Sequence, residues 1–478
     1  MAAAATGWMT AYHDRVADLP VAPAVSSAEL RAALTEPLPQ EGRDFTALLD
    51  TFRDVIVPGS RHNSHPRSFG YVTAPGTAIA TVADFLASGL NANLTAWRSA
   101  PAPVEVEHVA IDWITEALGV GPGAGGLFTS GGSMANLTAL AAARHAVCGD
   151  AITTGGAAAH PRPLRIYTSS QAHHSIHKSA ALLGIGRDNV REVAVDDRLR
   201  MDVDDLVARI EADRAAGADP CAVVASAGTV ITGAVDPLTD IAEVARRYRL
   251  WLHVDACYGG FARLAPSARA LFDGLAEADS IALDPHKWLY LSADCGCLIY
   301  RDPQRVRGAF TLDADYTRVL ESEPAEAFAF WDYGPELSRR FRALKVWMTL
   351  AYAGARAIGD AIESNIDCAR YGADLVGASD DLELMAPVEL SIVCFRYLPE
   401  RLRAGAPRSD DDEREIDDLN QRIMRTMQRG AGSYVSNASI GGRFALRACV
   451  LNYRTTRRDM EILLDDVRRA AADVTVAG

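Results

Sequence analysis

The sequence lacks the features that mark membrane, secreted and metal-binding proteins. It contains no run of about 18 uninterrupted apolar residues, which a membrane-spanning helix needs. Its first residues show no basic stretch followed by an apolar core, as a secretory signal would. Eight cysteines are spread along the chain, and the one close pair, Cys295 and Cys297, has no second pair at zinc-site spacing. We therefore expect a cytoplasmic protein without a membrane anchor or a metal site.

Positive charge is also scarce. The 478 residues include 48 lysines and arginines against 62 aspartates and glutamates, a net charge of −14. This balance argues against nucleic acid or an anionic membrane as a partner. Hydrophobic residues make up 49% of the chain and charged residues 23%, as in a globular protein with a substantial core.

Short apolar runs alternate with helical patterns through the middle of the chain. Apolar runs occur at 222–225, 251–254 and 280–283, and helical patterns at 204–215 and 238–249. This alternation predicts parallel βαβ units and an α/β fold with a doubly wound sheet. Active groups on such a sheet gather where strands end and helices begin.

The chain divides into three predicted parts. Residues 1–75 read as helices interrupted by prolines, and they form an arm too broken to build its own core. Residues 76–350 form the large domain with the strand–helix alternation, and residues 351–478 form a smaller C-terminal α/β domain. Segment 310–330 has weak periodicity and predicts a mobile loop.

Lys287 directly follows His286 in a segment whose flanking residues, up to Tyr290, are mostly apolar. Desolvation disfavours the charged form of a lysine, so we predict a lowered pKa for Lys287 and a nucleophilic amine. Such an amine forms a Schiff base with a carbonyl compound or with pyridoxal phosphate (PLP). The alternative is a lysine whose stem packs along Trp288 while its ammonium group reaches water.

Two further stretches with polar groups follow predicted strands. Gly131, Gly132 and Ser133 lead into a helix, whose N-terminus and free N–H groups favour an anion such as phosphate. The alternative is that these three residues form an ordinary turn that caps a helix, which has the same composition. His173, after the strand at 164–167, can stack its ring on an aromatic cofactor, or it is a capping or surface histidine.

Two more polar residues end apolar strands. The hydroxyl of Thr229 could reach a ring oxygen of a cofactor. Asp255 ends an otherwise apolar strand, and a buried carboxylate needs a cationic or hydrogen-bonding partner. That partner is a protonated pyridine nitrogen, a structural arginine or a set of backbone donors. With Lys287 these groups supply an anion cradle, a stacking ring, a carboxylate and an amine, a combination that fits PLP.

The chain resembles the group II PLP-dependent amino-acid decarboxylases, which include the aromatic-L-amino-acid and glutamate decarboxylases. The most specific motifs are His253–Ala256, Asp284–Trp288 and Ser338–Trp347, in the order of the family. The resemblance implies the type I fold of PLP-dependent transferases, with a mostly parallel seven-stranded sheet in the large domain. It also implies a lyase that uses PLP and works as a homodimer with shared active sites.

The resemblance implies a role for four residues around the cofactor ring. Lys287 matches the lysine that carries PLP, and Asp255 matches the partner of the pyridinium nitrogen. At about 4 Å such a pair gains roughly 4 kcal/mol at an effective dielectric near 20. A protonated ring is an electron sink for loss of CO2. His173 matches the histidine that stacks on one ring face, and Ala256 matches the small residue beneath the other.

Other positions match the family near the phosphate and in the catalytic loop. The phosphate positions are Gly132, Ser133, Asp284, His286 and, from the neighbouring subunit, Ser338. Asp284 departs from members with asparagine, because a carboxylate beside a phosphate needs a bridging donor or must point away. Tyr316 matches the tyrosine that protonates Cα after CO2 leaves, unless it is only an exposed loop residue. Relatives with phenylalanine there make aldehydes, so Tyr316 favours plain decarboxylation.

The family builds its substrate pocket partly from stretches of the second subunit that match 62–77 and 91–97. In this chain the pocket positions are Asn63, Tyr71, Val72, Ala74, Asn93, Thr95 and Trp97. Animal aromatic decarboxylases carry large apolar groups there, so this pocket is predicted to be wider and more polar. We expect α-decarboxylation of an L-amino acid, with tyrosine, tryptophan, phenylalanine or DOPA favoured. A non-aromatic substrate, an aldehyde synthase and a catalytically silent binder are the alternatives.

Overall fold

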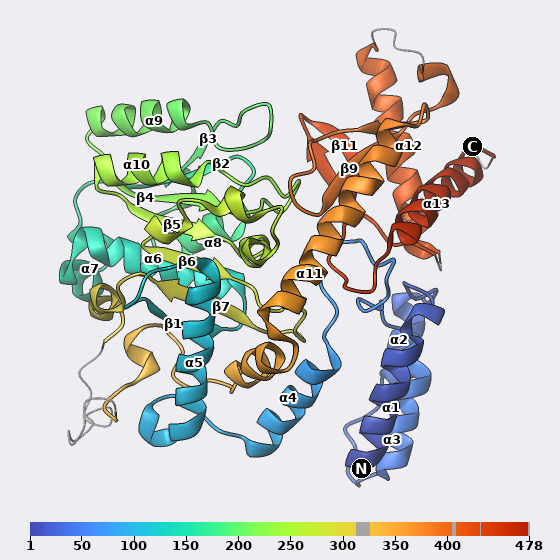
Figure 1. Cartoon of the computed structure of the whole chain (residues 1–478), viewed down its shortest axis with the longest axis horizontal. Helices are drawn as coiled ribbons and strands as arrows, with labels where there is room; N and C mark the ends of the chain where they lie inside the picture. The colour runs from blue at the N-terminus through green and yellow to red at the C-terminus, as the bar shows by residue number, and fades with distance from the viewer. Residues whose placement is uncertain (312–325, 404–407, 431, 477–478) are drawn as a thin grey trace. The chain divides into compact units, whose positions relative to one another are not determined.

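The computed structural model describes residues 1–311, 326–403, 408–430 and 432–476 (Figure 1). Tyr316 and most of the predicted loop 310–330 lie outside the described residues. The chain forms two compact units, the first Met1–Ala78, Ser364–Pro387 and Ser391–Gly478, the second Ile79–Glu363 and Val388–Leu390. The three-part division at residues 75 and 350 stays a prediction.

The second unit contains the predicted seven-stranded, mostly parallel sheet, with the order β1-β7-β6-β5-β4-β2-β3. Its strands are β1 (Gly125–Thr129), β2 (Leu164–Ser169), β3 (Val190–Val193), β4 (Asp219–Ser226), β5 (Trp251–Asp255), β6 (Ser280–Leu283) and β7 (Gly296–Tyr300). Only β7 is antiparallel to its neighbours, β1 and β6. The fold class expected from the sequence is confirmed.

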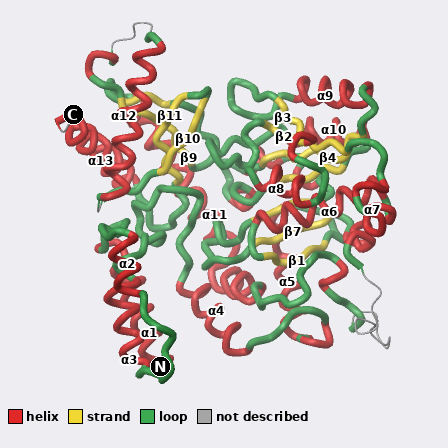
Figure 2. The backbone as a smooth tube through the Cα atoms, turned by 180° about the vertical axis from the view of Figure 1, so that it is seen from behind, coloured by secondary structure: helices red, strands yellow, loops and turns green. Residues whose placement is uncertain are grey.

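The α-helices of this unit that precede β5 in the chain are labelled in Figure 2, which views the chain from behind. They are α4 (Ala78–Leu90), α5 (Pro101–Leu118), α6 (Gly132–Cys148), α7 (Asp150–Gly155), α8 (Ser175–Leu182), α9 (Val203–Ala215) and α10 (Leu238–Tyr248). Helix α6 packs against β4 to β7, while α9 and α10 pack against β4. Every residue of β5, β6 and β7 is buried, which explains why these strands read as continuous apolar runs.

The connections of β5 and β6 place polar side chains at one edge of the sheet. Strands β4, β5 and β6 are parallel, so their carboxyl ends meet there. Because β7 returns antiparallel to β6, no crossover helix separates them, and residues 284–295 form the whole connection. Lys287 lies in this connection. The N-terminus of α6 follows β1, the strand beside β7.

The first unit holds a smaller antiparallel sheet with the order β10-β11-β9-β8. Its elements are α1 (Ala2–Arg15), α2 (Ser27–Leu34), α3 (Phe45–Thr51), β8 (Leu382–Leu384), β9 (Ile392–Tyr397), α12 (Asp410–Arg429), β10 (Ser436–Ile440), β11 (Arg443–Cys449) and α13 (Arg457–Val476). Helix α11 (Ala343–Gly377) begins in the second unit and ends in the first, with non-helical backbone angles at Gly354.

Residues near the end of the N-terminal segment hydrogen-bond to the C-terminal part of the first unit. The Phe69 N–H donates to the Tyr434 carbonyl at 2.8 Å, and the Phe69 carbonyl accepts from the Cys449 N–H at 2.9 Å. The Asn452 amide donates to the His65 carbonyl at 2.9 Å. These bonds anchor a stretch that contains several prolines. Among the described residues, no helix combines the length and apolar character needed to cross a lipid bilayer.

Candidate active site

Lys287 pairs with Asp284, three residues earlier in the β6–β7 connection. The Lys287 Nζ atom lies 2.9 Å from Asp284 Oδ2. Burial lowers the pKa of Lys287, but the charge and hydrogen bond of Asp284, together with Cys257 and Asp255, outweigh burial and raise that pKa above its ordinary value. The predicted fall in the pKa of Lys287 is therefore wrong for this structure. The sequence indicated desolvation because the neighbours of Lys287 are apolar. The ion pair with Asp284 depends instead on how the segment between β6 and β7 folds.

Asp255 ends β5 as a buried carboxylate held by neutral donors. Its Oδ2 accepts from the Asn136 side-chain amide at 2.9 Å, and its Oδ1 accepts from the Cys257 N–H at 3.2 Å. Burial alone raises the pKa of Asp255. The Cys257 N–H, nearby positive charge and the Asn136 amide outweigh burial and hold the pKa below its ordinary value. Asp255 is therefore ionised, and in the described part of the chain its hydrogen-bond partners are Asn136 and Cys257.

Asn136 on α6 links Asp255 to two histidines. Because a carboxylate only accepts, the Asn136 nitrogen faces Asp255, and the Asn136 oxygen accepts from His253 Nε2 at 2.8 Å. The same nitrogen donates to Ser175 Oγ at 2.9 Å, and Ser175 Oγ lies 2.8 Å from His173 Nδ1. Burial lowers the pKa of His253 to about 4, so its ring is neutral.

The backbone from Gly131 to Ser133, here called the glycine cradle, begins α6. A Cβ on Gly132 would lie 2.3 Å from Cys257 Sγ and 2.9 Å from Asp284 Oδ2, and Gly131 has a φ of 154°. The N–H groups of Met134 and Ala135 bond to the Gly131 carbonyl. In the described part of the chain, the N–H groups of Gly132 and Ser133 have no recorded acceptor. The cradle is thus open to an anion at a helix N-terminus.

Comparisons with known proteins identify the family. The profile described as "Pyridoxal-dependent decarboxylase conserved domain" matches residues 28–398. An aromatic-L-amino-acid decarboxylase from Bacillus atrophaeus is 34% identical over 458 residues, covering 96% of this chain and 92% of that protein. The chain belongs to the pyridoxal-dependent decarboxylase family. It is an amino-acid decarboxylase, and its cofactor is PLP.

Two solved structures are also similar to this decarboxylase. Oryza sativa TDC, solved with PLP and tryptamine, is 29% identical with a TM-score of 0.89, and the match covers 98% of this chain and 96% of that one. Rhodiola rosea 4-hydroxyphenylacetaldehyde synthase is 29% identical with a TM-score of 0.86, covering 99% and 97%. Both matches extend over both units of the decarboxylase.

The residues around Lys287 fit PLP. The cradle offers N–H groups without acceptors for a phosphate, and Asp255 offers an ionised carboxylate for a protonated ring nitrogen. Lys287 offers an amine for the aldehyde. In addition, the buried Oδ1 atom of Asp284 has no hydrogen-bond partner among the described residues. His286 Nδ1 lies 2.7 Å from the Cys295 carbonyl and 3.7 Å from Asp284 Oδ1.

The structure brings Cys257, rather than Ala256, to this group. Cys257 Sγ lies 2.3 Å from the position that a Cβ would take on Gly132, and the Cys257 N–H bonds to Asp255 Oδ1. Ala256 Cβ lies 3.0 Å from the position that a Cβ would take on Gly260. Burial and nearby carboxylates raise the pKa of the Cys257 thiol, which is therefore neutral. No role at the site was predicted from the sequence for Cys257, Asn136, Ser175 or His253 of the decarboxylase.

Three predicted cofactor residues are placed less directly. His173 is exposed, and partial burial of its ring lowers its pKa. The Thr229 hydroxyl lies 3.2 Å from Thr232 Oγ1 and accepts from the Ala234 N–H at 3.2 Å. Among the residues that the structure describes, the Thr229 hydroxyl has these two partners and no hydrogen bond to Lys287. Ser338 is exposed in the segment before α11.

The predicted substrate residues of the decarboxylase fall into both units. In the second unit, Asn93 Oδ1 accepts from the Arg339 N–H at 2.9 Å and from Thr95 Oγ1 at 3.0 Å, next to Ser338. Trp97 Nε1 donates to Glu105 at 2.8 Å. The first unit holds Asn63, Tyr71, Val72 and Ala74. Tyr71 is 54% exposed, and the guanidinium of Arg61 lies 5.0 Å from the centre of its ring.

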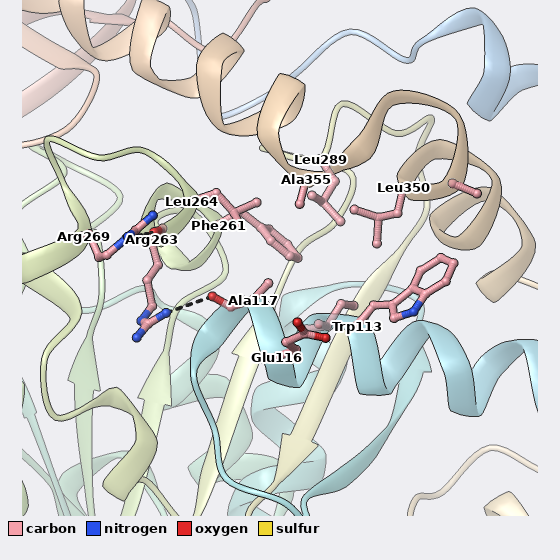
Figure 3. Close-up of a pocket in the computed structure, with 12 residues that line it drawn as sticks. Trp113, Glu116, Ala117, Phe261, Arg263, Leu264, Arg269, Leu289, Leu350 and Ala355 are labelled. Atoms are coloured by element: carbon pink, nitrogen blue, oxygen red, sulfur yellow. Dashed lines mark hydrogen bonds between the residues drawn. The ribbon is translucent and has the colours of Figure 1, made fainter.

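A cavity of about 570 Å³ lies elsewhere in the second unit (Figure 3). Apolar side chains, among them Phe261, Leu289 and Leu350, form most of its wall. Arg263 donates to the Ala117 carbonyl at 3.1 Å along one side. None of the residues drawn there was assigned to cofactor or substrate. The cavity and the glycine cradle of the decarboxylase are therefore lined by different residues.

Proposed function

We propose that this chain decarboxylates an aromatic L-amino acid at Cα to give an amine and CO2, with PLP held as a Schiff base on Lys287. The observation that carries the proposal is the grouping of Lys287, ionised Asp255 and the glycine cradle at one edge of the sheet. The aromatic preference is supported by the Bacillus atrophaeus aromatic decarboxylase and by Oryza sativa TDC, solved with tryptamine.

When bound, PLP supplies an electron sink for the electron pair that the Cα–CO2 bond leaves behind. Asp255 serves this chemistry by holding a proton at the ring nitrogen. Its ionised state depends on the Cys257 N–H, on nearby positive charge and on the Asn136 amide. Neutral donors stabilise the carboxylate without cancelling the charge that attracts the pyridinium proton.

His173 and the cradle orient the cofactor. The hydrogen bond between His173 Nδ1 and Ser175 Oγ fixes the plane of the imidazole, which stacks on the ring. The N–H groups of Gly132 and Ser133 hold the phosphate together with His286. Thr229 is assigned to the ring oxygen. Cys257, whose sulfur lies beside the glycine cradle, is assigned to the second ring face in place of Ala256.

We extend the proposal to a homodimer in the cytoplasm. In a homodimer, Ser338 of a second copy completes the phosphate site, and the seven substrate positions of the sequence analysis come from both copies. An interface of this kind is isologous, so each copy gives and receives the same residues. Tyr316 is assigned as the acid that protonates Cα after CO2 has left.

The attachment of PLP is tested by borohydride reduction. The chain has three lysines, Lys178, Lys287 and Lys345, so mass spectrometry of the digested protein assigns the fixed cofactor without ambiguity. We expect a yellow protein with the modification on Lys287. Lys287→Ala should abolish turnover, and Lys178→Ala, on an exposed position of α8, is the matched control. Turnover of several amino acids by Lys287→Ala would show the mechanism to be wrong.

The substrate and the product are tested together. Amine formation is assayed across the proteinogenic amino acids and their hydroxylated relatives, and we expect the aromatic members to give the highest kcat/KM. Oxygen uptake is recorded in the same samples. Peroxide and aldehyde in place of amine would assign the chain to the aldehyde synthases, whose Rhodiola rosea member is a structural relative.

A further inference from the structure

Asp284 places a carboxylate directly against the glycine cradle. Its Oδ2 lies 2.9 Å from the position that a Cβ would take on Gly132, and its Oδ1 lies 3.9 Å from the corresponding position on Gly131. Asp284 is 4% exposed, so water compensates little of its charge. A phosphate held by the N–H groups of Gly132 and Ser133 therefore lies beside a second anion.

The charge of Asp284 is balanced mainly by Lys287. The Lys287 Nζ atom lies 2.9 Å from Oδ2, whereas His286 Nδ1 lies 3.7 Å from Oδ1 and is engaged with the Cys295 carbonyl. Oδ1 accepts no hydrogen bond from any described residue. Among the described residues, other titratable groups that interact electrostatically with Asp284 include His173, Cys257, Cys295 and Cys297. None of the cysteine thiols supplies a positive charge.

When PLP is attached to Lys287, the ammonium group no longer balances the charge of Asp284. The Lys287 nitrogen forms a C=N bond with the aldehyde carbon, and the aldehyde oxygen leaves as water. Before it attacks, the ammonium group must give up one proton, and Asp284 Oδ2 is the carboxylate oxygen in contact with it. The same ligand brings a phosphate into the cradle. Asp284 then faces this phosphate while its former counter-ion is part of the C=N bond.

We propose that Asp284 binds a proton when a phosphate group lies in the glycine cradle, so that PLP binding by this decarboxylase is coupled to protonation of Asp284. A neutral carboxyl group donates one hydrogen bond through its O–H, which an ionised one cannot. Oδ1, the oxygen without a partner, faces Gly131 and is the atom placed to donate. The inference rests on the proposed attachment of PLP to Lys287.

The test compares PLP with pyridoxal, which has the same ring and aldehyde but no phosphate. Dissociation constants of both are measured from pH 6 to 8.5 for the wild-type protein and for Asp284→Asn, which keeps the shape of the side chain. The contribution of Lys287 is common to both ligands and cancels in the ratio of the two constants. In the wild-type protein we expect the preference for PLP over pyridoxal to fall by up to about tenfold for each rise of one pH unit.

In Asp284→Asn this preference should change only as much as the titration of the phosphate itself requires. That titration is shared by both proteins, so the difference between them reports Asp284. Asp279→Asn is the matched control, since Asp279 precedes β6 and pairs with Arg301 at 2.7 Å. This variant should follow the wild-type curve. Circular dichroism verifies the folding of each variant.

Calorimetry supplies a second measurement on the wild-type protein alone. Titrations in two buffers with different ionisation enthalpies count the protons taken up, and PLP should take up about one more than pyridoxal after correction for its phosphate. Equal pH dependence in the wild-type protein and Asp284→Asn, with PLP fixed on Lys287 by borohydride, overturns this inference and leaves the proposed function intact. Failure of borohydride to fix PLP on Lys287 overturns both.

Discussion

The side-chain amide of Asn136 donates to Asp255 at 2.9 Å while its oxygen accepts from His253 at 2.8 Å. Asn136 lies on the first turns of α6, three residues after Ser133, and His253 and Asp255 lie on β5. The helix that forms the glycine cradle is thereby tied to the strand that carries the carboxylate. Asn136 thus links Asp255, the residue proposed to face the cofactor ring, to the helix whose N-terminus is proposed to hold the phosphate.

Replacement of Asn136 should weaken PLP binding. A hydrogen bond to a charged group contributes about 1.5–3 kcal/mol, which corresponds to a tenfold to hundredfold change in affinity. We expect Asn136→Ala to raise the dissociation constant of PLP by that factor and to lower kcat, because Asp255 loses a donor. Titration of the apoprotein with PLP, followed by absorbance, measures the effect. Asn189→Ala, which removes a bond to the Ile185 carbonyl away from the site, should bind PLP normally.

An added methyl group on Gly132 should block the cradle. The new Cβ would lie 2.3 Å from Cys257 Sγ, closer than any side-chain contact allows, so one of the two must move. We expect Gly132→Ala to weaken PLP binding at least tenfold. Gly121→Ala is the matched control, since a Cβ there meets no atom within 4 Å.

Removal of the sulfur should relieve part of this clash. In the double variant Gly132→Ala/Cys257→Ala we expect PLP affinity to recover partly, because Asp284 Oδ2 still lies 2.9 Å from the new Cβ. The two substitutions should therefore be non-additive in a double-mutant cycle. Additive effects would show that Cys257 does not limit the space of the cradle.

Much of the fold was visible in the sequence because buried parallel strands read as uninterrupted apolar runs. The runs at 222–225, 251–254 and 280–283 fall within β4, β5 and β6. Lys287 and Asp255 were found because each ends or follows such a run. Cys257 lies two residues beyond the end of β5, so the strand period does not place its side chain.

Other parts of the site have no sequence signal. Asn136 and Asp255 are 119 residues apart, and an asparagine in an alanine-rich helix carries no sign of its partner. The ion pair of Lys287 with Asp284 depends on a short connection whose backbone path the sequence pattern does not specify. Apolar neighbours alone predict a lowered pKa for Lys287, whereas Asp284, Cys257 and Asp255 together raise it.

Arg339 and Glu107 form an ion pair that should stabilise the second unit. Their side chains are 1% and 0% exposed, and Arg339 also donates to the Phe128 carbonyl at 2.8 Å. Loss of one partner leaves a buried charge alone, which costs about 3–5 kcal/mol. We expect Arg339→Met to lower the free energy of unfolding by this amount, measured by urea denaturation.

The apolar double variant Arg339→Met/Glu107→Leu distinguishes the contribution of the ion pair itself from the cost of leaving one buried charge alone. Because it leaves no unpaired charge, it should lose less stability than Arg339→Met alone. Arg458→Met, whose partner Glu461 lies on an exposed turn of α13, should change stability by less than about 1 kcal/mol. A double variant less stable than the single one would show that the pair contributes more than its charges.

His253 should make the protein less stable in acid. Burial lowers its pKa to about 4 in the folded state, against 6.5 when exposed. Below pH 6.5 the unfolded chain therefore binds the proton more readily, and stability falls as the pH drops towards 4. A shift of this size corresponds to about 3 kcal/mol in full, at about 1.4 kcal/mol for each pH unit.

A variant without the imidazole tests this assignment. His253→Gln keeps an amide N–H that can donate to Asn136 but has no group that titrates between pH 4 and 7. We expect its melting temperature to fall less steeply than that of the wild-type protein between pH 6.5 and 4.5. His65 is the comparison, because burial also lowers its pKa to about 4 and its replacement should flatten the profile in the same direction. Parallel profiles for His253→Gln and the wild-type protein would mean that folding does not lower the pKa of His253.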